Sequence, residues 1–301
     1  MINAAISLKP AFINYGIRFI KKYENSTHTI RLSDNHRESF DNGVYPYNKI
    51  LNELVELEIC KQINDSYVID LPKYENLDLR QILLLKAIKK INPSWLRKLR
   101  YGTDNLKNLE DDDPSSYQSL KEAGIFEEDL SEDAENLIYE LKKIIYFDDS
   151  YERNKIELGR FGEKLSLKYE LFKTGNKPFH QSIRRENLGF DIISYLPNNI
   201  EKKIEVKTCK SSKFYITRNE WETALNSIAQ NELYEFHIWR WKNNGWELAI
   251  VNPKDTDIPQ WTKTAQGHIW HDFEMNLEAF DKYFVSEATL YSDNKLGNKI
   301  N

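Results

Sequence analysis

The spacing of the apolar residues changes near residue 150, and this change predicts two regions of different architecture. Before it, apolar residues recur at the three- and four-residue intervals typical of helices. After it, short segments that alternate apolar and polar residues follow one another between turns. A chain of 301 residues is long enough for two domains. We expect a mainly helical domain at residues 1–150 and a mixed α+β or α/β domain at residues 151–301.

The first region contains a helix-and-hairpin pattern of the kind found in winged-helix DNA-binding domains. Residues 47–57 favour a helix, and residues 60–69 favour a hairpin that turns at Asn64-Asp65. A helix followed directly by a tight hairpin is the outline of a winged helix. A helix and a hairpin that merely pack together fit the same residues. Further helices are predicted at residues 78–91, 93–101 and 131–147.

Composition excludes several classes of protein. The chain is 40% hydrophobic and 13% aromatic, which is sufficient for a core and excludes a disordered protein. Cys60 and Cys209 lie far apart, so they suggest neither a metal motif nor a disulfide framework, and a reducing compartment is expected. No apolar run has the length of a membrane span, and the start lacks the pattern of a signal peptide. We expect a soluble, cytoplasmic protein with no membrane partner.

Charge is distributed unevenly along the chain. The net charge of −5 gives no indication of a nucleic-acid partner. Between Arg153 and Glu220, however, fifteen Lys and Arg stand against eight Asp and Glu. A basic segment beside an acidic one suggests an anionic partner for the basic segment, although charge blocks also mark ordinary solvated surfaces.

The second region reads as a helix, three strands, a helix and further strands. The first helix, at residues 155–172, is expected to bury Leu158, Phe161, Leu165 and Phe172. Residues 217–220 form a capping-box pattern that begins the second helix, and Asn244-Gly245 indicates a hairpin. Strands are predicted at residues 179–183, 190–195, 203–209, 214–216, 234–241 and 246–251.

One group of polar residues falls on two neighbouring predicted strands. Because side chains alternate along a strand, Glu205 and Lys207 share one face, and Ile204, Val206 and Thr208 share the other. Asp191 lies on the preceding strand, and the thirteen residues between it and Glu205 suffice for a hairpin that brings the two carboxylates together.

Paired carboxylates beside an amine suggest metal-dependent chemistry. Two adjacent carboxylates repel each other, and a divalent cation such as Mg²⁺ removes that cost. Such a cation can polarise a phosphodiester, while Lys207 orients the attacking water or offsets the developing negative charge. The simpler alternative is that Glu205 and Lys207 form a solvated charge pair and that Asp191 is an ordinary turn residue.

The order of these residues resembles the PD-(D/E)xK nuclease superfamily, with Phe190 in place of the proline. More closely, residues 150–255 resemble the C-terminal domain of the plant protein NO VEIN, which also occurs in bacterial restriction and defence proteins. The matching segments are residues 159–163, 189–194, 204–208 and 214–221. This resemblance implies a restriction-endonuclease-like core of mixed sheet flanked by helices. It also implies that Glu163 joins Asp191 and Glu205 at the metal, with Glu170 as a weaker alternate.

Several further residues are candidates for binding. Arg184, Arg185, Lys210 and Lys213 are expected to hold phosphates of a nucleic acid. Trp239, Trp241 and Trp246 are expected to fill a core or to cover a sheet rather than stack on bases. His268 and His271 have zinc-like spacing without further ligands, so a structural or surface role is expected.

The functional expectation is a Mg²⁺-dependent endonuclease in which Mn²⁺ can substitute. By analogy with the family, the expected substrate is double-stranded DNA, the expected role is restriction or antiviral defence, and a homodimer or a separate defence-system partner is compatible with it. Two alternatives remain open at this point. One is a catalytically silent module that binds DNA or serves assembly, and the other is an RNase.

Overall fold

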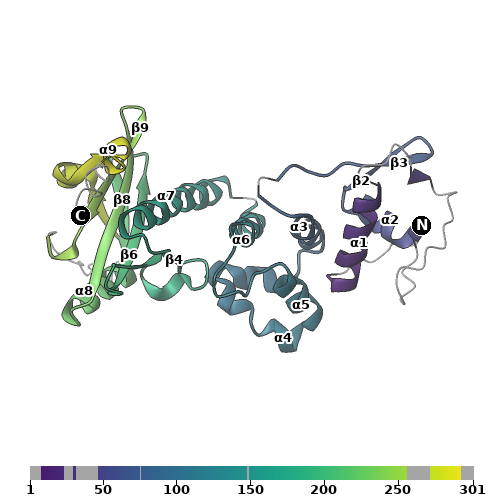
Figure 1. Cartoon of the computed structure of the whole chain (residues 1–301), viewed down its shortest axis with the longest axis horizontal. Coiled ribbons are helices and arrows are strands. Elements are labelled where there is room, and N and C mark those ends of the chain that lie inside the picture. Colours follow the sequence, from purple (N-terminus) through teal and green to yellow (C-terminus); the bar gives the residue numbers. More distant parts are fainter. Residues whose placement is uncertain are drawn as a thin grey trace, which may run out of the picture. The chain divides into compact units, whose positions relative to one another are not determined.

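The computed structural model describes residues 8–23, 30–31, 47–74, 76–147, 149–255 and 272–292. The chain divides into two compact units, Met1–Phe147 and Asp148–Asn301 (Figure 1). We call them the N-terminal unit and the C-terminal unit, and each is described by itself. Across the described ranges, no helix has both the length and the apolar character that crossing a bilayer would require.

The N-terminal unit is built mainly from helices, and the predicted helices in it are confirmed. Asp78 and Gln81 form a capping box that begins the predicted helix at residue 79, and Ser131 caps the helix that follows it. The segment after Pro93 is a 3-10 helix that Gly102 ends, as expected for a short helix closed by glycine. The helices are α1 (Pro10–Tyr23), α2 (Tyr47–Glu56), α3 (Leu79–Ile91), η1 (Ser94–Tyr101), η2 (Thr103–Leu106), α4 (Leu109–Asp112), α5 (Pro114–Glu122) and α6 (Glu132–Ile145).

The predicted hairpin after α2 is also confirmed. Strands β2 (Cys60–Ile63) and β3 (Ser66–Ile69) pair antiparallel, and Asn64 adopts the positive φ that the tight turn needs. The short strand β1 (Ile30–Arg31) pairs with β3 and gives the order β1-β3-β2. This small sheet therefore draws together segments from before and after α2.

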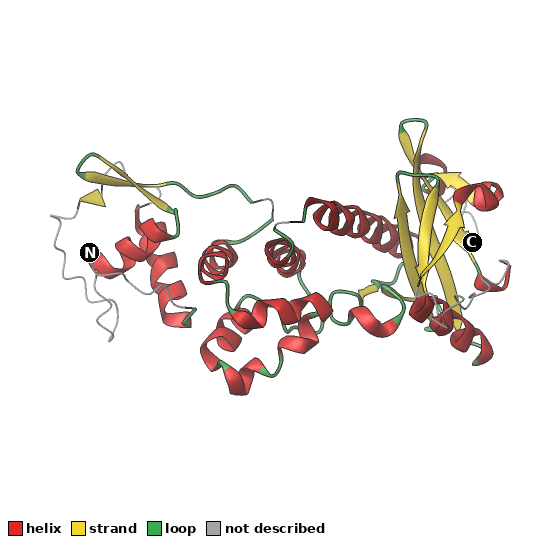
Figure 2. Cartoon of the chain, turned by 180° about the vertical axis from the view of Figure 1, so that it is seen from behind, coloured by secondary structure: helices red, strands yellow, loops and turns green. Residues whose placement is uncertain are grey.

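The C-terminal unit contains a six-stranded mixed sheet, which confirms a fold of helices and sheet (Figure 2). Its order is β11-β9-β8-β6-β5-β4; β6 and β8 are parallel and every other neighbouring pair is antiparallel. A two-stranded ribbon of β7 and β10 accompanies it. The strands are β4 (Phe179–His180), β5 (Ile192–Tyr195), β6 (Glu201–Cys209), β7 (Lys213–Thr217), β8 (Leu233–Lys242), β9 (Gly245–Val251), β10 (Asp272–Asn276) and β11 (Phe284–Ser286).

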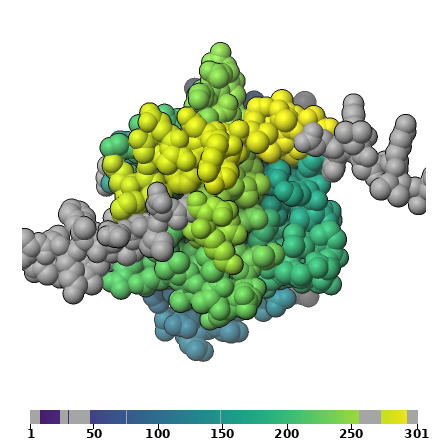
Figure 3. All heavy atoms as spheres, turned by 90° about the vertical axis from the view of Figure 1, so that its left-hand side faces the viewer, coloured from purple at the N-terminus to yellow at the C-terminus, as the bar shows by residue number. Residues whose placement is uncertain are grey.

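Helices cover both faces of this sheet and create two separate cores. Helix α7 (Ser150–Thr174) packs on one face, where its Leu165 and Tyr169 meet Ile204 of β6 and Trp239 of β8. Helix α8 (Arg218–Ala229) packs on the other face, together with β7 and the 3-10 helix η5 (Leu277–Tyr283). In Figure 3 the segment of residues 272–292 is drawn in yellow; its η5 packs on this second face, whereas Leu290 and Tyr291 at its end pack on the α7 side. The remaining short elements are η3 (Glu186–Leu188), η4 (Pro253–Asp255) and α9 (Glu287–Leu290).

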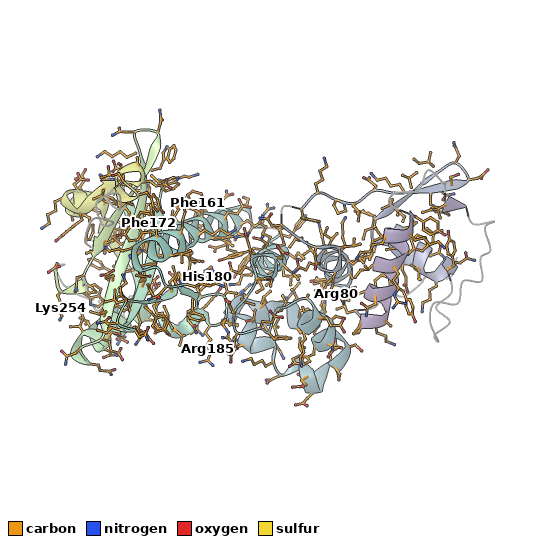
Figure 4. All side chains as sticks on the ribbon, viewed as in Figure 1. Arg80, Phe161, Phe172, His180, Arg185 and Lys254 are labelled. Carbon is orange, nitrogen blue, oxygen red and sulfur yellow. The ribbon has the colours of Figure 1, made fainter. Side chains whose placement is uncertain are left out.

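The predicted buried side of α7 is partly wrong. Leu165 is buried, but Phe161 is 41% exposed, and the buried face instead runs through Gly162, Ser166 and Glu170. The reason is a close approach of the helix to the sheet. A Cβ placed on Gly162 would lie 1.7 Å from the Thr208 hydroxyl of β6, so this glycine must face the strand. Figure 4 labels Phe161 and Phe172 along α7.

Two predicted strands are shorter than expected. The strand predicted at residues 179–183 ends at His180, because the backbone then turns and the amides of Arg184 and Arg185 donate to the Gln181 carbonyl. The strand predicted at residues 190–195 begins at Ile192. These changes leave Asp191 just outside regular structure, at the edge where the strand starts.

The tryptophans differ in their surroundings. Trp239 has no exposed surface, and its indole N–H donates to Ser166 Oγ at 2.8 Å, so its predicted core position is confirmed. Trp241 is 48% exposed at the end of β8, so of its two predicted roles it does not fill a core; its ring lies against that of Trp246 on the neighbouring strand. The β8–β9 turn holds Asn243 and Asn244 at positive φ, as the hairpin prediction requires. His268 and His271 lie outside the described residues.

Candidate active site

Backbone hydrogen bonds fix Asp191 directly beside Glu205. The Asp191 amide donates to the Ile204 carbonyl at 2.9 Å, and Asp191 Oδ2 accepts the Val206 amide at 2.8 Å. Asp191 thus bonds to both chain neighbours of Glu205. Its own carbonyl accepts the amides of Gln181 and Ser182, which anchors the same segment from the β4 side. The chain therefore folds so that the Asp191 carboxylate, directly before β5, lies beside the position of Glu205 on β6.

Lys207 lies between two carboxylates on the α8 side of the sheet. Its Nζ is 2.8 Å from Glu205 Oε1 and 2.6 Å from Glu220 Oε2. Glu205 and Lys207 occupy alternate positions on β6, which confirms that they share a face. Glu220 has a second task, because its Oε2 also accepts the Thr217 amide and so closes the capping box of α8.

Glu220 is therefore a site residue that the sequence reasoning missed. Its pattern, a threonine followed three residues later by a glutamate, was fully explained as a helix cap. The position of this capping box in the chain could have identified Glu220 as a site residue. The helix begins directly after β7, and β7 follows the strand that carries Glu205 and Lys207.

Glu163 reaches the same region from α7. Its Oε2 lies 2.6 Å from Nε2 of His180 on β4, and its charge acts on Asp191. His180, buried on the strand that pairs with β5, is a second residue that sequence reasoning did not single out. Figure 4 labels His180 below α7. The pairing holds the Glu163 carboxylate towards the sheet.

The electrostatics of this group are those of crowded, buried acids. Burial and the nearby Glu163 charge raise the pKa of Asp191 to about 7, against the opposing effect of Lys207. Burial raises the pKa of Glu205 well above its ordinary value, and the charges of Asp191 and Glu220 add to this. Burial alone would lower the pKa of Lys207, but the surrounding carboxylates outweigh it and raise that pKa. Lys207 is therefore an ammonium near neutral pH.

The donor set fits a hard divalent cation. Burial raises the pKa values of the two central acids, and the excess of negative charge from four carboxylates around one ammonium adds to this rise. Mg²⁺ is usually held by one or two carboxylates, with waters and substrate phosphates completing its shell. Asp191 and Glu205 suit that number. Glu163, Asp191 and Glu205 do not, however, form a tight triplet; in the described parts of the chain, the set of three groups within 4.8 Å of one another lies elsewhere.

A cleft opens onto these carboxylates. It has a volume of about 350 Å³, and Asp191, Glu205 and Glu220 line it, together with the residues around η3 and the first turn of α8. Gly189 in that wall has a φ of 75°, and a Cβ there would meet Thr223 Oγ1 at 2.3 Å, so only glycine fits. The two central carboxylates therefore form part of the wall of an open cleft.

The predicted phosphate-binding residues are not among those that line this cleft. Lys213 lies on β7, and its Nζ is 2.5 Å from Glu274 Oε1 of β10. Arg184 and Arg185 occupy the turn after β4, and Figure 4 labels Arg185 there. Lys210 lines a different groove of about 820 Å³, together with Phe161, Trp241 and Trp246.

The alternate ligand Glu170 is not part of this site. It lies fully buried on α7, and its Oε1 is 3.0 Å from the Lys202 ammonium. The seven-residue spacing from Glu163 gives both residues nearly the same direction, but it also moves Glu170 about 10 Å along the helix axis. Glu170 therefore reaches a different part of the sheet.

Residues 162–250 match the family described as Protein NO VEIN, C-terminal. The match begins at the close contact of α7 with β6 and ends in β9, so it contains Glu163, Asp191, Glu205, Lys207 and Glu220. It covers less than a third of the chain and none of the N-terminal unit. Searches of curated proteins and of solved structures give no match. The sequence predicted that this part of the chain resembles the C-terminal domain of NO VEIN, and the family match confirms that resemblance.

Proposed function

We propose that the C-terminal unit is a metal-dependent nuclease that hydrolyses phosphodiester bonds, with Mg²⁺ or Mn²⁺ held by Asp191 and Glu205. The observation that carries the proposal is the pair of hydrogen bonds that ties Asp191 to the residues on either side of Glu205. A helix, a strand led by Asp191, a strand with Glu-x-Lys and a second helix also follow the order of the PD-(D/E)xK, restriction-endonuclease-like core.

Each residue of the site has a defined part in this proposal. A bound divalent cation would supply Lewis acidity towards a phosphodiester oxygen and favour deprotonation of the attacking water. Lys207, which stays protonated, offsets the negative charge that develops on the phosphorus oxygens. Glu220, in the first turn of α8, pairs with the Lys207 ammonium of β6 and holds it in position. Glu163, held by His180, supports the site through its charge on Asp191.

The substrate and biological role rest on analogy. Restriction and defence proteins that carry this type of domain act on DNA, so double-stranded DNA and a cytoplasmic antiviral role are proposed. The N-terminal unit is proposed to recognise the target or a defence-system partner. Its α2, hairpin and β1-β3-β2 sheet support a winged helix, because that plan also places a helix before a paired hairpin.

A cleavage assay tests the proposal. Supercoiled plasmid, single-stranded DNA and RNA are incubated with the protein and Mg²⁺ or Mn²⁺. We expect Asp191→Ala and Lys207→Ala to abolish cleavage with an unchanged circular dichroism spectrum. Lys203→Ala is the matched control, because Lys203 lies on the same strand but pairs with Glu232. If both site variants cleave as well as the parent, the site is wrong.

The same experiment separates the alternatives. A parent protein that binds DNA but cleaves no substrate with either metal would favour the silent binding module. Cleavage confined to RNA would favour the RNase. Plasmid that becomes linear in one step would indicate paired active sites and hence a homodimer, whereas plasmid that is nicked first would indicate independent single centres.

A further inference from the structure

A second polar cluster lies on the face of the sheet that α7 covers, opposite the face of Glu205 and Lys207. Glu170 comes from α7, and Glu235 and His237 come from alternate positions of β8. One ligand atom from each lies within 4.8 Å of the others. Figure 1 shows α7 beside β6 and β8, the elements that meet here. The cluster is part of the C-terminal unit and belongs to no step of the proposed hydrolysis.

Several polar atoms of this cluster are buried and have no hydrogen-bond partner in the part of the chain that the structure describes. They are Glu170 Oε2 and both ring nitrogens of His237, and neither residue has any exposed surface. Ser194 Oγ, on the position of β5 directly opposite Lys202, shares this property. Buried polar atoms are nearly always hydrogen-bonded, so a group of them at one place is a site for a bound water or ion.

Lys202 partly neutralises the cluster but does not complete it. Its Nζ is 3.0 Å from Glu170 Oε1 and 2.9 Å from Glu235 Oε2. The two carboxylates carry one more negative charge than this ammonium balances. The Lys202 ammonium donates to these two carboxylates, while the ring nitrogens of His237, one of which has a lone pair when the imidazole is neutral, lack a hydrogen-bond partner among the described residues.

The distances suit a small metal ion. His237 Nε2 lies 3.7 Å from Glu170 Oε1 and 3.7 Å from Glu235 Oε2. Ligand atoms that each lie about 2.1 Å from one ion are separated by roughly 3–4 Å. One imidazole and two carboxylates are the donors that Zn²⁺ and similar transition metals accept, whereas Mg²⁺ prefers oxygen alone.

We propose that Glu170, Glu235 and His237 form a second metal site, which binds a divalent transition metal such as Zn²⁺ in exchange for the Lys202 ammonium. The ion ties α7 to β8 and stabilises the C-terminal unit, whereas the cation at Asp191 and Glu205 would serve chemistry. Because both positive groups use the same two carboxylate oxygens, the metal and Lys202 compete. Removing the ammonium therefore strengthens metal binding.

Zinc binding to the full-length chain tests this site independently of the first. The background is Asp191→Asn with Glu205→Gln, which removes the ligands of the proposed catalytic cation. Bound zinc is counted by atomic emission after dialysis, and its affinity is measured by calorimetry. We expect one zinc per chain, an affinity at least tenfold weaker for His237→Gln and Glu235→Gln, and at least tenfold stronger for Lys202→Met.

Two controls identify the position of the ion. Lys203→Met, next along β6 and paired with Glu232, should leave the zinc affinity unchanged. His268→Gln with His271→Gln should do the same, although their spacing resembles a zinc motif. The proposal is overturned if no zinc is retained, or if bound zinc is insensitive to the His237 and Glu235 variants. Zinc retained by a chain whose parent cleaves nothing would overturn only the nuclease proposal.

Folding is monitored in the same samples. Glu235 is half-buried, so Glu235→Gln disturbs the core less than His237→Gln does. If His237→Gln unfolds, the zinc measurements are made with Glu235→Gln. Added zinc should raise the melting temperature of the Asp191→Asn, Glu205→Gln protein and leave that of its Glu235→Gln derivative unchanged. An equal rise in both proteins would also overturn the proposal.

Discussion

Three groups of Asp191 form hydrogen bonds with the backbone, and these bonds hold its carboxylate in a buried place where its ionised form is unfavourable. Its amide, carbonyl and carboxylate all bond to neighbouring strands or turns, so the carboxylate cannot move away from Glu163 and Glu205. Burial and the Glu163 charge raise its pKa to about 7. The folded protein thus binds a proton that the unfolded chain releases near its ordinary pKa of 3.8.

The first prediction follows from that shift. Because the folded-state pKa is raised, metal-free stability is greatest at low pH and falls as the pH rises towards 7. With EDTA present, we expect the free energy of unfolding to fall by about 3 kcal/mol from pH 5 to pH 8, because a fall of ~1.4 kcal/mol per unit extends over the two units from pH 5 to the pKa of about 7. Asp191→Asn should remove most of this fall, since the amide oxygen still accepts the Val206 amide. Urea denaturation at both pH values provides the measurement, and equal slopes for both proteins would contradict it.

The second prediction concerns Glu220. Glu220→Gln keeps an oxygen for the Thr217 amide but removes one of the two charges that hold Lys207. We expect kcat to fall by about tenfold. The acid limb of the pH–rate profile should move to lower pH, because loss of this charge lowers the pKa of Glu205 and Asp191. Glu222→Gln is the matched control, since Glu222 pairs with Arg218 on the exposed side of α8. An unshifted profile would show that Glu220 is only a helix cap.

At the scale of elements, the contact between α7 and β6 sets how the helix is rotated. A Cβ at Gly162 would lie 1.7 Å from Thr208 Oγ1 and 2.9 Å from Thr208 Cβ, whereas one at Gly159 would meet nothing within 4 Å. We expect Gly162→Ala to destabilise the protein by about 2 kcal/mol through overpacking. Gly159→Ala, three residues earlier in the same helix, should stabilise it by roughly 0.5–1 kcal/mol. Chemical denaturation distinguishes them, and equal effects would mean that the helix is not held at Gly162.

The same contact explains what the sequence could and could not predict. Alternation along residues 203–209 placed Glu205 and Lys207 on one face, and the Thr217 capping box located the start of α8. Both depend on residues close in the chain. The rotation of α7 depends on Thr208, a partner from a distant strand, so Phe161 was wrongly placed inside. The seven-residue spacing predicts that Glu170 and Glu163 point in nearly the same direction from the helix. It does not show that the sheet brings Lys202 against Glu170, which is its actual partner.

At the scale of the whole molecule, the two units divide the work in the proposed function. Each has its own buried residues, and the family match lies entirely in the C-terminal unit. The carboxylates, the ammonium and the cleft come from that unit alone. If the N-terminal unit serves recognition, its removal should affect substrate binding far more than the chemical step.

The last prediction tests this division. Residues 148–301 produced alone should unfold cooperatively, because α7 and α8 already cover both faces of the sheet. With Mg²⁺ the fragment should cleave plasmid at saturation with a kcat within about threefold of the full chain, while its KM rises at least tenfold. Steady-state kinetics on one plasmid measures both constants. A fragment that folds but has lost kcat would place an essential catalytic group in the N-terminal unit, and an unchanged KM would remove the reason to assign recognition to it.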